Sequence, residues 1–147
     1  MIERCESVEA EGWLTLRQAL WPHCTADEHL SEMSALCASP NRFVQFIAYA
    51  SARRAIGFVE ASVRSDYVNG TESSPVGFLE GIYVVPEQRR QGVARSLIAN
   101  AEQWVQSVGC HEFASDALLQ NQQSHALHRS LGFSETERVV FFRKVLA

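Results

Sequence analysis

Long apolar runs are missing from this sequence of 147 residues. Without a run of about 18 apolar residues, no segment is expected to cross a membrane as a helix. The first six residues carry acids where a secretory signal would carry bases and then an apolar stretch. Four cysteines are scattered along the chain without a CxxC pair, so a disulfide framework is not expected. These absences predict a cytoplasmic protein with free thiols.

Positive charge is also scarce, because 13 basic residues face 17 acidic ones for a net charge of −4. Neutralisation of phosphates dominates general nucleic-acid affinity, so this balance argues against a nucleic-acid-binding protein. Lys144 is the single lysine, and three of the arginines cluster at Arg89, Arg90 and Arg95. Such a cluster in an acidic chain suggests one surface for an anion and a second surface for a cation.

No metal site and no second domain are indicated. His23, Cys24 and His29 lie close together, but no second ligand pair with matching spacing accompanies them. The chain is 46% hydrophobic, enough to build a core, and it shows no internal repeat or linker. We therefore expect a single domain over residues 1–147.

Hydrophobic periodicity predicts alternating helices and strands. Strands are expected at residues 2–5, 43–50, 55–63, 78–85, 111–115 and 137–145, and helices at 8–20, 25–38, 93–108 and 122–131. Thr25 and Glu28 form the pattern of a capping box at the start of the second helix. The strands at 43–50 and 55–63 read as an antiparallel hairpin. The order of elements predicts an α/β (α+β) fold with a mixed sheet and its longest loop at 66–77.

The segment from 78 to 108 carries the clearest chemical signal. Its strand ends at Pro86, and a polar loop with Arg89, Arg90 and Gly92 leads directly into a helix. Glycine allows a ligand to approach the backbone closely, and the first N–H groups of a helix are free to bind an anion. The pattern therefore predicts a pyrophosphate site. A surface loop with incidental arginines before an ordinary helix is the alternative.

The loop resembles a known signature. Arg89-x-x-Gly92-x-Ala94 after Val84-Val85-Pro86 is similar to the acetyl-CoA motif of the GNAT N-acetyltransferases, and Asn121 and Leu131-Gly132-Phe133 match the next part of that pattern. The resemblance implies a mixed, mostly antiparallel central sheet flanked by helices. It implies acetyl-CoA as cosubstrate and no metal. The cofactor-binding residues that it implies are Ile82, Tyr83, Val84, Arg89, Arg90, Gln91, Gly92, Val93, Ala94, Arg95 and Asn121.

His128 departs from the family pattern. Many members have a tyrosine four residues before the glycine of the Gly-Phe pair, where it protonates the leaving thiolate, and here that position is His128. Histidine can act as an acid near neutral pH. The residue can equally be a packed helix side chain.

A narrower resemblance lies outside the cofactor motif. Residues 20–22, 66–70, 73–76, 78–82, 114–116 and 135–138 resemble the aminoglycoside 6′-N-acetyltransferases. This resemblance implies acetyl transfer to the 6′-amine of an antibiotic such as kanamycin or tobramycin, and hence antibiotic resistance. It also implies a homodimer. A GNAT enzyme for another amine, either a polyamine or a protein N-terminus, and a non-catalytic module that only binds acetyl-CoA remain the alternatives.

The carboxylates fit an amine substrate. Direct transfer needs a neutral amine, so a group must hold the ammonium and accept its proton. Glu80 lies mid-strand in an apolar run, where we expect it to be shielded from water, and Asp116 ends another strand. We expect both to be catalytic, with the backbone N–H groups near Ile82 and Tyr83 stabilising the oxyanion. The predicted substrate-binding residues are Trp21, Tyr67, Glu80, Asp116 and Glu137.

Each of these residues also has an ordinary structural explanation. Glu80 can be a surface residue of an edge strand, Asp116 can be a turn or helix-cap residue, and Glu137 can simply be exposed by the last strand. The two aromatic residues can be plain core or loop side chains.

Overall fold

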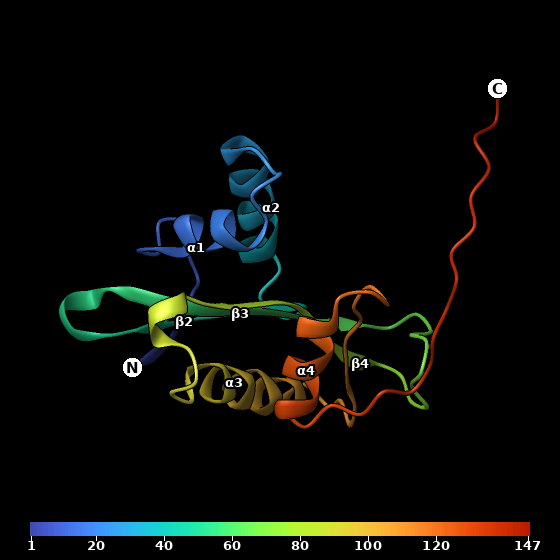
Figure 1. Cartoon of the computed structure of the whole chain (residues 1–147). Helices are drawn as coiled ribbons and strands as arrows, with labels where there is room; N and C mark the ends of the chain where they lie inside the picture. Colours follow the sequence, from blue (N-terminus) through green and yellow to red (C-terminus); the bar gives the residue numbers. More distant parts are fainter. The chain divides into compact units, whose positions relative to one another are not determined.

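The computed structural model describes all residues from Met1 to Ala147, which form two compact units, Met1–Asp116 and Ala117–Ala147. The first unit contains a five-stranded sheet in the order β1-β2-β3-β4-β5 (Figure 1). Its strands are β1 (Ile2–Arg4), β2 (Phe43–Tyr49), β3 (Ala55–Arg64), β4 (Val76–Val84) and β5 (Phe113–Ala114). Only β4 and β5 run parallel. The expected mixed and mostly antiparallel sheet, with its 43–64 hairpin, is confirmed.

Helices cover both faces of this sheet. On one face lie α1 (Trp13–Leu20) and α2 (Ala26–Ala38), and on the other lies α3 (Val93–Ser107), as Figure 1 shows. Short 3₁₀ turns, η1 (Ser51–Arg53) and η2 (Pro86–Gln88), connect neighbouring elements. None of the helices is long and apolar enough to cross a membrane.

Local sequence explains where the helices begin. The capping box predicted for α2 is present, because the Thr25 hydroxyl accepts from the N–H of Glu28 at 3.1 Å and the Glu28 carboxylate accepts from the N–H of Thr25 at 3.1 Å. The backbone of Gly12 has a φ of 84°, and α1 therefore begins at Trp13 instead of residue 8.

The core of the first unit lies between α1, α2 and the sheet. Trp13, Met33 and Phe58 are fully buried there, and Ile47 is 1% exposed. Burying each such side chain stabilises the fold by about 1.5–3 kcal/mol. On the opposite face, α3 buries a continuous apolar stripe made of Leu97, Ile98, Ala101, Trp104 and Val105.

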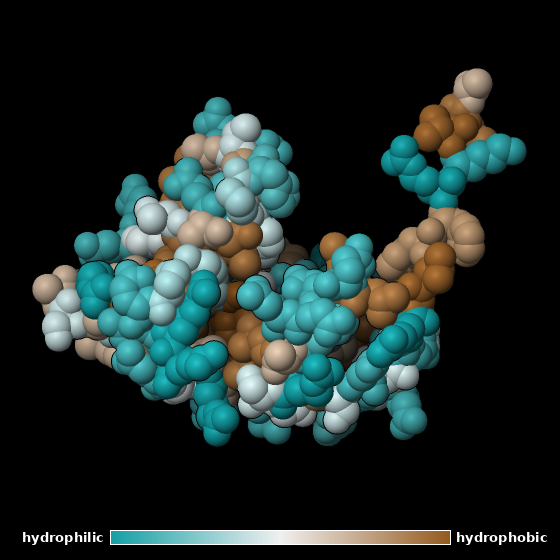
Figure 2. All heavy atoms as spheres, viewed as in Figure 1, coloured by the Kyte–Doolittle hydropathy of each residue, from teal (hydrophilic) through white to brown (hydrophobic).

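The predicted strand at 137–145 is wrong. The second unit contains one helix, α4 (Gln122–Ser130), and no strand follows it (Figure 1). Alternating apolar residues create the potential for a strand, but a strand forms only when its backbone N–H and C=O groups find a partner. Residues 137–147 are all exposed, with Phe141 at 85% and Phe142 at 91%. Figure 2 shows apolar residues along much of this segment.

Candidate active site

The middle of β4 has an open edge. The pairing of β4 with β5 covers only Gly77↔Phe113 and Phe78↔Ala114, while the pairing with β3 continues to Val84. From residue 79 to 84 the edge away from β3 therefore has no strand beside it. Its outward N–H and C=O groups can pair with an extended ligand, except for the Val84 carbonyl, which accepts from Arg89. The predicted cofactor residues Ile82, Tyr83 and Val84 lie on this stretch.

Glu80 lies at an irregularity in the same strand. Glu60 pairs with Gly81 and Ala61 pairs with Leu79, so Glu80 has no partner residue on β3. A bulge of this kind bends the strand and redirects a side chain. The pairing with β3 thus gives Glu80 a different orientation from the one a regular strand would give.

The carboxylate of Glu80 is held by two side chains of β3. The Ser62 hydroxyl donates to it at 2.5 Å, and Nη2 of Arg64 lies 3.0 Å from both oxygens. The Arg64 guanidinium also stacks 3.5 Å from the centroid of the Phe78 ring. The side chain of Glu80 is 32% exposed, so the expectation that it is shielded from water is wrong. The bulge brings it to the surface, where it is accessible to a cationic substrate.

Asp116 follows β5 and is also exposed. It comes two residues after Ala114, and Glu80 comes two residues after Phe78, the partner of Ala114 in the parallel pair. The two predicted catalytic residues thus each lie two positions beyond the same parallel pair, on neighbouring strands that run in the same direction.

The loop before α3 has the geometry of an anion site. Gly92 is the N-cap residue with a φ of 85°, and a Cβ built on it would meet no atom within 4 Å. Arg90 also has a positive φ, of 60°. The first main-chain hydrogen bond of α3 runs from Ser96 to Gly92, which leaves the N–H groups of Val93, Ala94 and Arg95 in the first turn without a helical acceptor. The open space at Gly92 and these N–H groups fit a pyrophosphate.

The arginines of the loop differ in their contacts. Nε of Arg89 donates to the Val84 carbonyl at 2.8 Å, and its guanidinium lies 5.5 Å from the centroid of the Tyr83 ring. Arg89 therefore fastens the loop to the end of β4. Arg90 and Arg95 are exposed beside Gly92, and Gln91 is exposed as well.

The indole of Trp21 packs against β4. A Cβ on Gly81 would lie 2.5 Å from Cζ2 of Trp21, so the ring occupies the space that any larger residue would need. Its ring also meets Phe58 edge-on, with centroids 5.9 Å apart. Trp21 is half-buried and lies against the residue that follows Glu80.

Tyr67 lies in the loop between β3 and β4 and is 72% exposed. That loop spans 65–75, shorter than the expected 66–77, because β4 starts at Val76. The Ser73 hydroxyl and the N–H of Glu72 donate to the Glu112 carboxylate, which lowers the pKa of that carboxyl below its ordinary value. The loop is thereby anchored to the residue that precedes β5.

The remaining predicted residues belong to the second unit. The Asn121 side chain caps α4 by accepting from the N–H of Ser124 at 3.1 Å. Nδ1 of His128 lies 2.7 Å from the Ser124 carbonyl, and its ring meets Phe133 edge-on at 5.3 Å. Glu137 is exposed and lies outside any strand.

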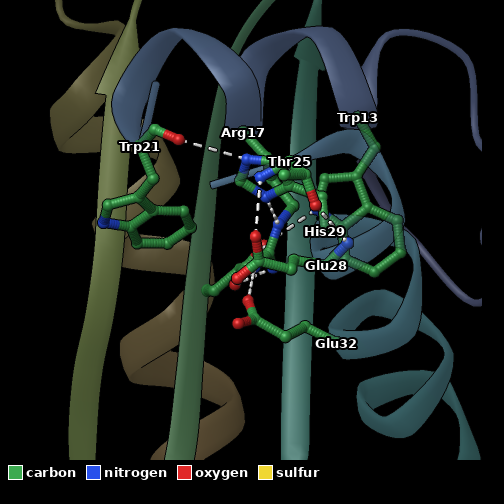
Figure 3. Close-up of polar contacts among 8 residues, drawn as sticks. Trp13, Arg17, Trp21, Thr25, Glu28, His29 and Glu32 are labelled. Atoms are coloured by element: carbon green, nitrogen blue, oxygen red, sulfur yellow. Dashed lines mark hydrogen bonds and ion pairs between the residues drawn. The ribbon is translucent and has the colours of Figure 1, made fainter. Parts of the chain in front are cut away.

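Sequence reasoning missed a polar cluster, formed by the buried residues Trp13, Arg17, His29 and Glu60 together with the exposed Glu32. Figure 3 shows Trp13, Arg17, His29 and Glu32 of this cluster. Nη1 of Arg17 lies 2.8 Å from both carboxylate oxygens of Glu60, and the indole N–H of Trp13 donates to the same group at 2.9 Å. Burial raises the pKa of the Glu60 carboxyl above its ordinary value, although Arg17 and Trp13 oppose the shift. The signal in the sequence that could have indicated this cluster is Arg17, a charged residue on the apolar face of α1.

The sequence of this chain is similar to those of known proteins. The sequence profile described as "Acetyltransferase (GNAT) family" matches residues 11–133. The aminoglycoside N(6′)-acetyltransferase type 1 of Acinetobacter baumannii is 54% identical over 136 residues, which are 92% of each chain. A protein of the same name from Serratia marcescens is 48% identical over 146 residues, 99% of each chain.

Solved structures agree over the full length. A crystal structure of an aminoglycoside 6′-N-acetyltransferase from Acinetobacter haemolyticus has a TM-score of 0.93 at 51% identity, covering 100% of this chain and 99% of that one. The structure of AAC(6′)-Iy with the bisubstrate analogue CoA-S-monomethyl-acetylneamine has a TM-score of 0.92 at 45% identity, with 99% and 98% covered. These matches establish that the chain belongs to the GNAT acetyltransferase family.

Proposed function

We propose that this protein transfers the acetyl group of acetyl-CoA to the 6′-amine of aminoglycoside antibiotics and so confers resistance to them. The observation that carries the proposal is the extent of the likeness, since proteins named for this activity match over 92% or more of both chains. An exposed carboxylate beside the open β4 edge suits a polycationic sugar, because opposite charges attract across a partly exposed site.

The geometry of α3 and β4 supports the proposed cofactor site. The N–H groups of Val93, Ala94 and Arg95 would hold the pyrophosphate, with Arg90 and Arg95 adding positive charge. The strand edge at 82–84 would pair with the amides of the pantetheine arm, and Arg89 would keep the loop in place through Val84. Gln91 and Asn121 complete the set that the family resemblance implies.

The carboxylates orient and deprotonate the substrate amine. Acetyl-CoA supplies the acetyl group as a thioester, whose carbonyl carbon the neutral amine attacks directly. The C–N bond forms, the C–S bond breaks, and coenzyme A leaves as a thiolate that takes up the proton lost by the attacking amine. Glu80 and Asp116 would orient the substrate ammonium and accept its proton. The ammonium takes over the place at Glu80 that Arg64 holds in this structure. Backbone N–H groups near Ile82 and Tyr83 would stabilise the oxyanion. Trp21 and Tyr67 offer apolar faces to the sugar rings, and Glu137 adds attraction for a further ammonium.

Release of coenzyme A with a panel of amines tests this function. Kanamycin and tobramycin should support rapid release, and the product should be acetylated once, at the 6′-amine. Faster release with a polyamine or a peptide N-terminus would assign a different substrate class. Binding of acetyl-CoA without release in the presence of any amine would mark a non-catalytic module, and acetylation at a 3- or 2′-amine would refute the site of transfer.

We further propose one cytoplasmic acetyltransferase domain over residues 1–147 that works as a homodimer. The dimer is supported by the C-terminal segment, where Val140, Phe141 and Phe142 are each at least 76% exposed. A row of exposed apolar residues is a common mark of a protein–protein interface. Four free cysteines suit a reducing compartment. Light scattering after size-exclusion chromatography should give twice the chain mass, and deletion of 139–147 should give the monomer.

A further inference from the structure

The buried polar cluster between α1, α2 and β3 is not used by the proposed chemistry. Arg17 is 2% exposed, Glu60 is 4% exposed, and His29 is completely buried. An apolar group of similar size is often at least as stabilising as a buried ion pair, so stability alone is a weak reason for such a cluster. What the cluster can do that apolar residues cannot is hold another group in a fixed direction.

The hydrogen bonds of the cluster lead to Trp21. The Glu60 carboxylate accepts from Nη1 of the Arg17 guanidinium. Nε of Arg17 lies 3.2 Å from Nδ1 of His29, and Nε2 of His29 lies 3.2 Å from the Trp21 carbonyl (Figure 3). A guanidinium can only donate, so Nδ1 of His29 accepts. The imidazole hydrogen is therefore on Nε2, which donates to Trp21. One chain of hydrogen bonds thus runs from β3 through α1 and α2 to this backbone carbonyl, with Arg17 donating to both Glu60 and His29.

The ring of Trp21 also has contacts on several sides. The N–H of Trp21 donates to the Arg17 carbonyl at 2.8 Å, and the Arg17 guanidinium lies 4.9 Å from the centroid of the indole. A cation over an aromatic face is attractive, more so when both groups are shielded from water. Phe58 and Gly81 meet the ring from the side of the sheet. Arg17 therefore contacts both the backbone and the ring of the same residue.

We propose that Arg17, His29 and Glu60 are positioning residues that set where the Trp21 indole stands in the acceptor-substrate site. The inference rests on the proposed function, in which Trp21 forms an apolar wall for a sugar ring next to Glu80. Transfer needs the amine within about 3–3.5 Å of the carbonyl carbon, so an error of about 1 Å in the wall is costly. The cluster links the placement of the substrate to the packing of α2, a helix outside the reaction site.

Kinetics of three variants test the proposal. His29→Leu removes the donor to Trp21 and should raise KM for kanamycin about tenfold, with KM for acetyl-CoA unchanged. His29→Gln keeps an amide that can donate to the same carbonyl and should restore most of the affinity. Met33→Ala, one turn away on the same helix and equally buried, removes core volume but none of the hydrogen bonds of the cluster. It should lower the melting temperature and leave KM for kanamycin unchanged.

A spectroscopic readout follows Trp21 itself. In protein labelled with 5-fluorotryptophan, Trp21→Phe identifies the ¹⁹F resonance of Trp21. That resonance should shift or broaden in His29→Leu and stay in place in Met33→Ala. If His29→Leu does not fold, Arg17→Lys replaces it, since lysine keeps the charge near Glu60 but has no Nε–H for His29.

Two results would overturn the proposal. One is an unchanged Trp21 resonance in His29→Leu or its substitute Arg17→Lys, and the other is an equal rise of KM for kanamycin in Met33→Ala. Failure of the proposed function would look different, because wild-type protein would then bind acetyl-CoA and release no coenzyme A with any aminoglycoside. That result is visible before any variant is made.

Discussion

Replacing Gly81 with alanine tests whether the Trp21 indole is part of the acceptor site. The added Cβ would lie 2.5 Å from Cζ2 and 2.6 Å from Cη2 of Trp21, and 3.2 Å from Cδ2 of Leu20. Carbon atoms in contact prefer about 3.5–4.0 Å, so the ring must move by roughly 1 Å or more. A displacement of about 1 Å can cost about 10²-fold in rate. We expect kcat/KM for kanamycin to fall by about 10- to 100-fold.

Gly77 provides the matched control on the same strand. A Cβ there would lie 2.5 Å and 2.6 Å from the two γ-carbons of Val105 on α3, the same crowding on the opposite face of the sheet. Overpacking of a core costs about 1–3 kcal/mol, so both variants should lose similar stability. For a chain of this size each kcal/mol lowers Tm by about 2–4 °C. Gly77→Ala should therefore melt early but keep a normal KM for kanamycin.

Steady-state release of coenzyme A, measured with both variants alongside calorimetry, decides the question. Equal losses of kcat/KM in Gly77→Ala and Gly81→Ala would attribute the effect to general destabilisation. A wild-type KM in a destabilised Gly81→Ala would show that the indole is not in contact with the substrate. Either result would refute the reasoning.

Three further predictions concern the cofactor site, the carboxylates and a buried thiol. Gly92→Asp should weaken acetyl-CoA binding about tenfold or more in calorimetry, whereas Gly109→Asp, at another positive-φ glycine with open space, should not. Glu80→Gln or Asp116→Asn should lower kcat about 10²-fold if that acid is the general base; wild-type turnover in both would refute the carboxylate mechanism. Burial raises the pKa of Cys5 from 9.0 to about 12. The folded chain therefore keeps this proton where the unfolded chain has lost it, and from about pH 9 to 12 the free energy of unfolding should fall by up to about 1.4 kcal/mol per pH unit. Denaturant titrations of wild type and Cys5→Ala should differ in that slope, and equal slopes would contradict the assignment.

Local signals in the sequence predicted most of the fold. The capping box at Thr25, the apolar stripe of α3 and the glycine before it depend on residues within a few positions of one another, so a single sequence shows them. The loop before α3, which we propose binds acetyl-CoA, is a local signal of the same kind. The mixed sheet followed from the order of the elements.

Features that depend on distant pairing could not be read in this way. The position of Glu80 depends on how β4 pairs with β3, and one extra residue in that register changes it from a shielded to an exposed carboxylate. Arg17 and Glu60 lie 43 residues apart in the sequence, and each alone looks like an intrusion in an apolar pattern. The alternation of apolar residues at 137–145 predicted a strand, and none forms. An alternating pattern does not by itself supply a neighbouring strand to pair with.

The open edge of β4 also affects how readily the protein aggregates. From residue 79 to 84 its backbone groups face no neighbouring strand on one side. An uncovered edge is a template for another chain, so protein without ligand is exposed to aggregation on warming. At the proposed cofactor site, acetyl-CoA would cover that edge and, by binding only the folded state, would shift the population toward it. Without acetyl-CoA, the protein should therefore aggregate at a lower temperature than with acetyl-CoA in excess.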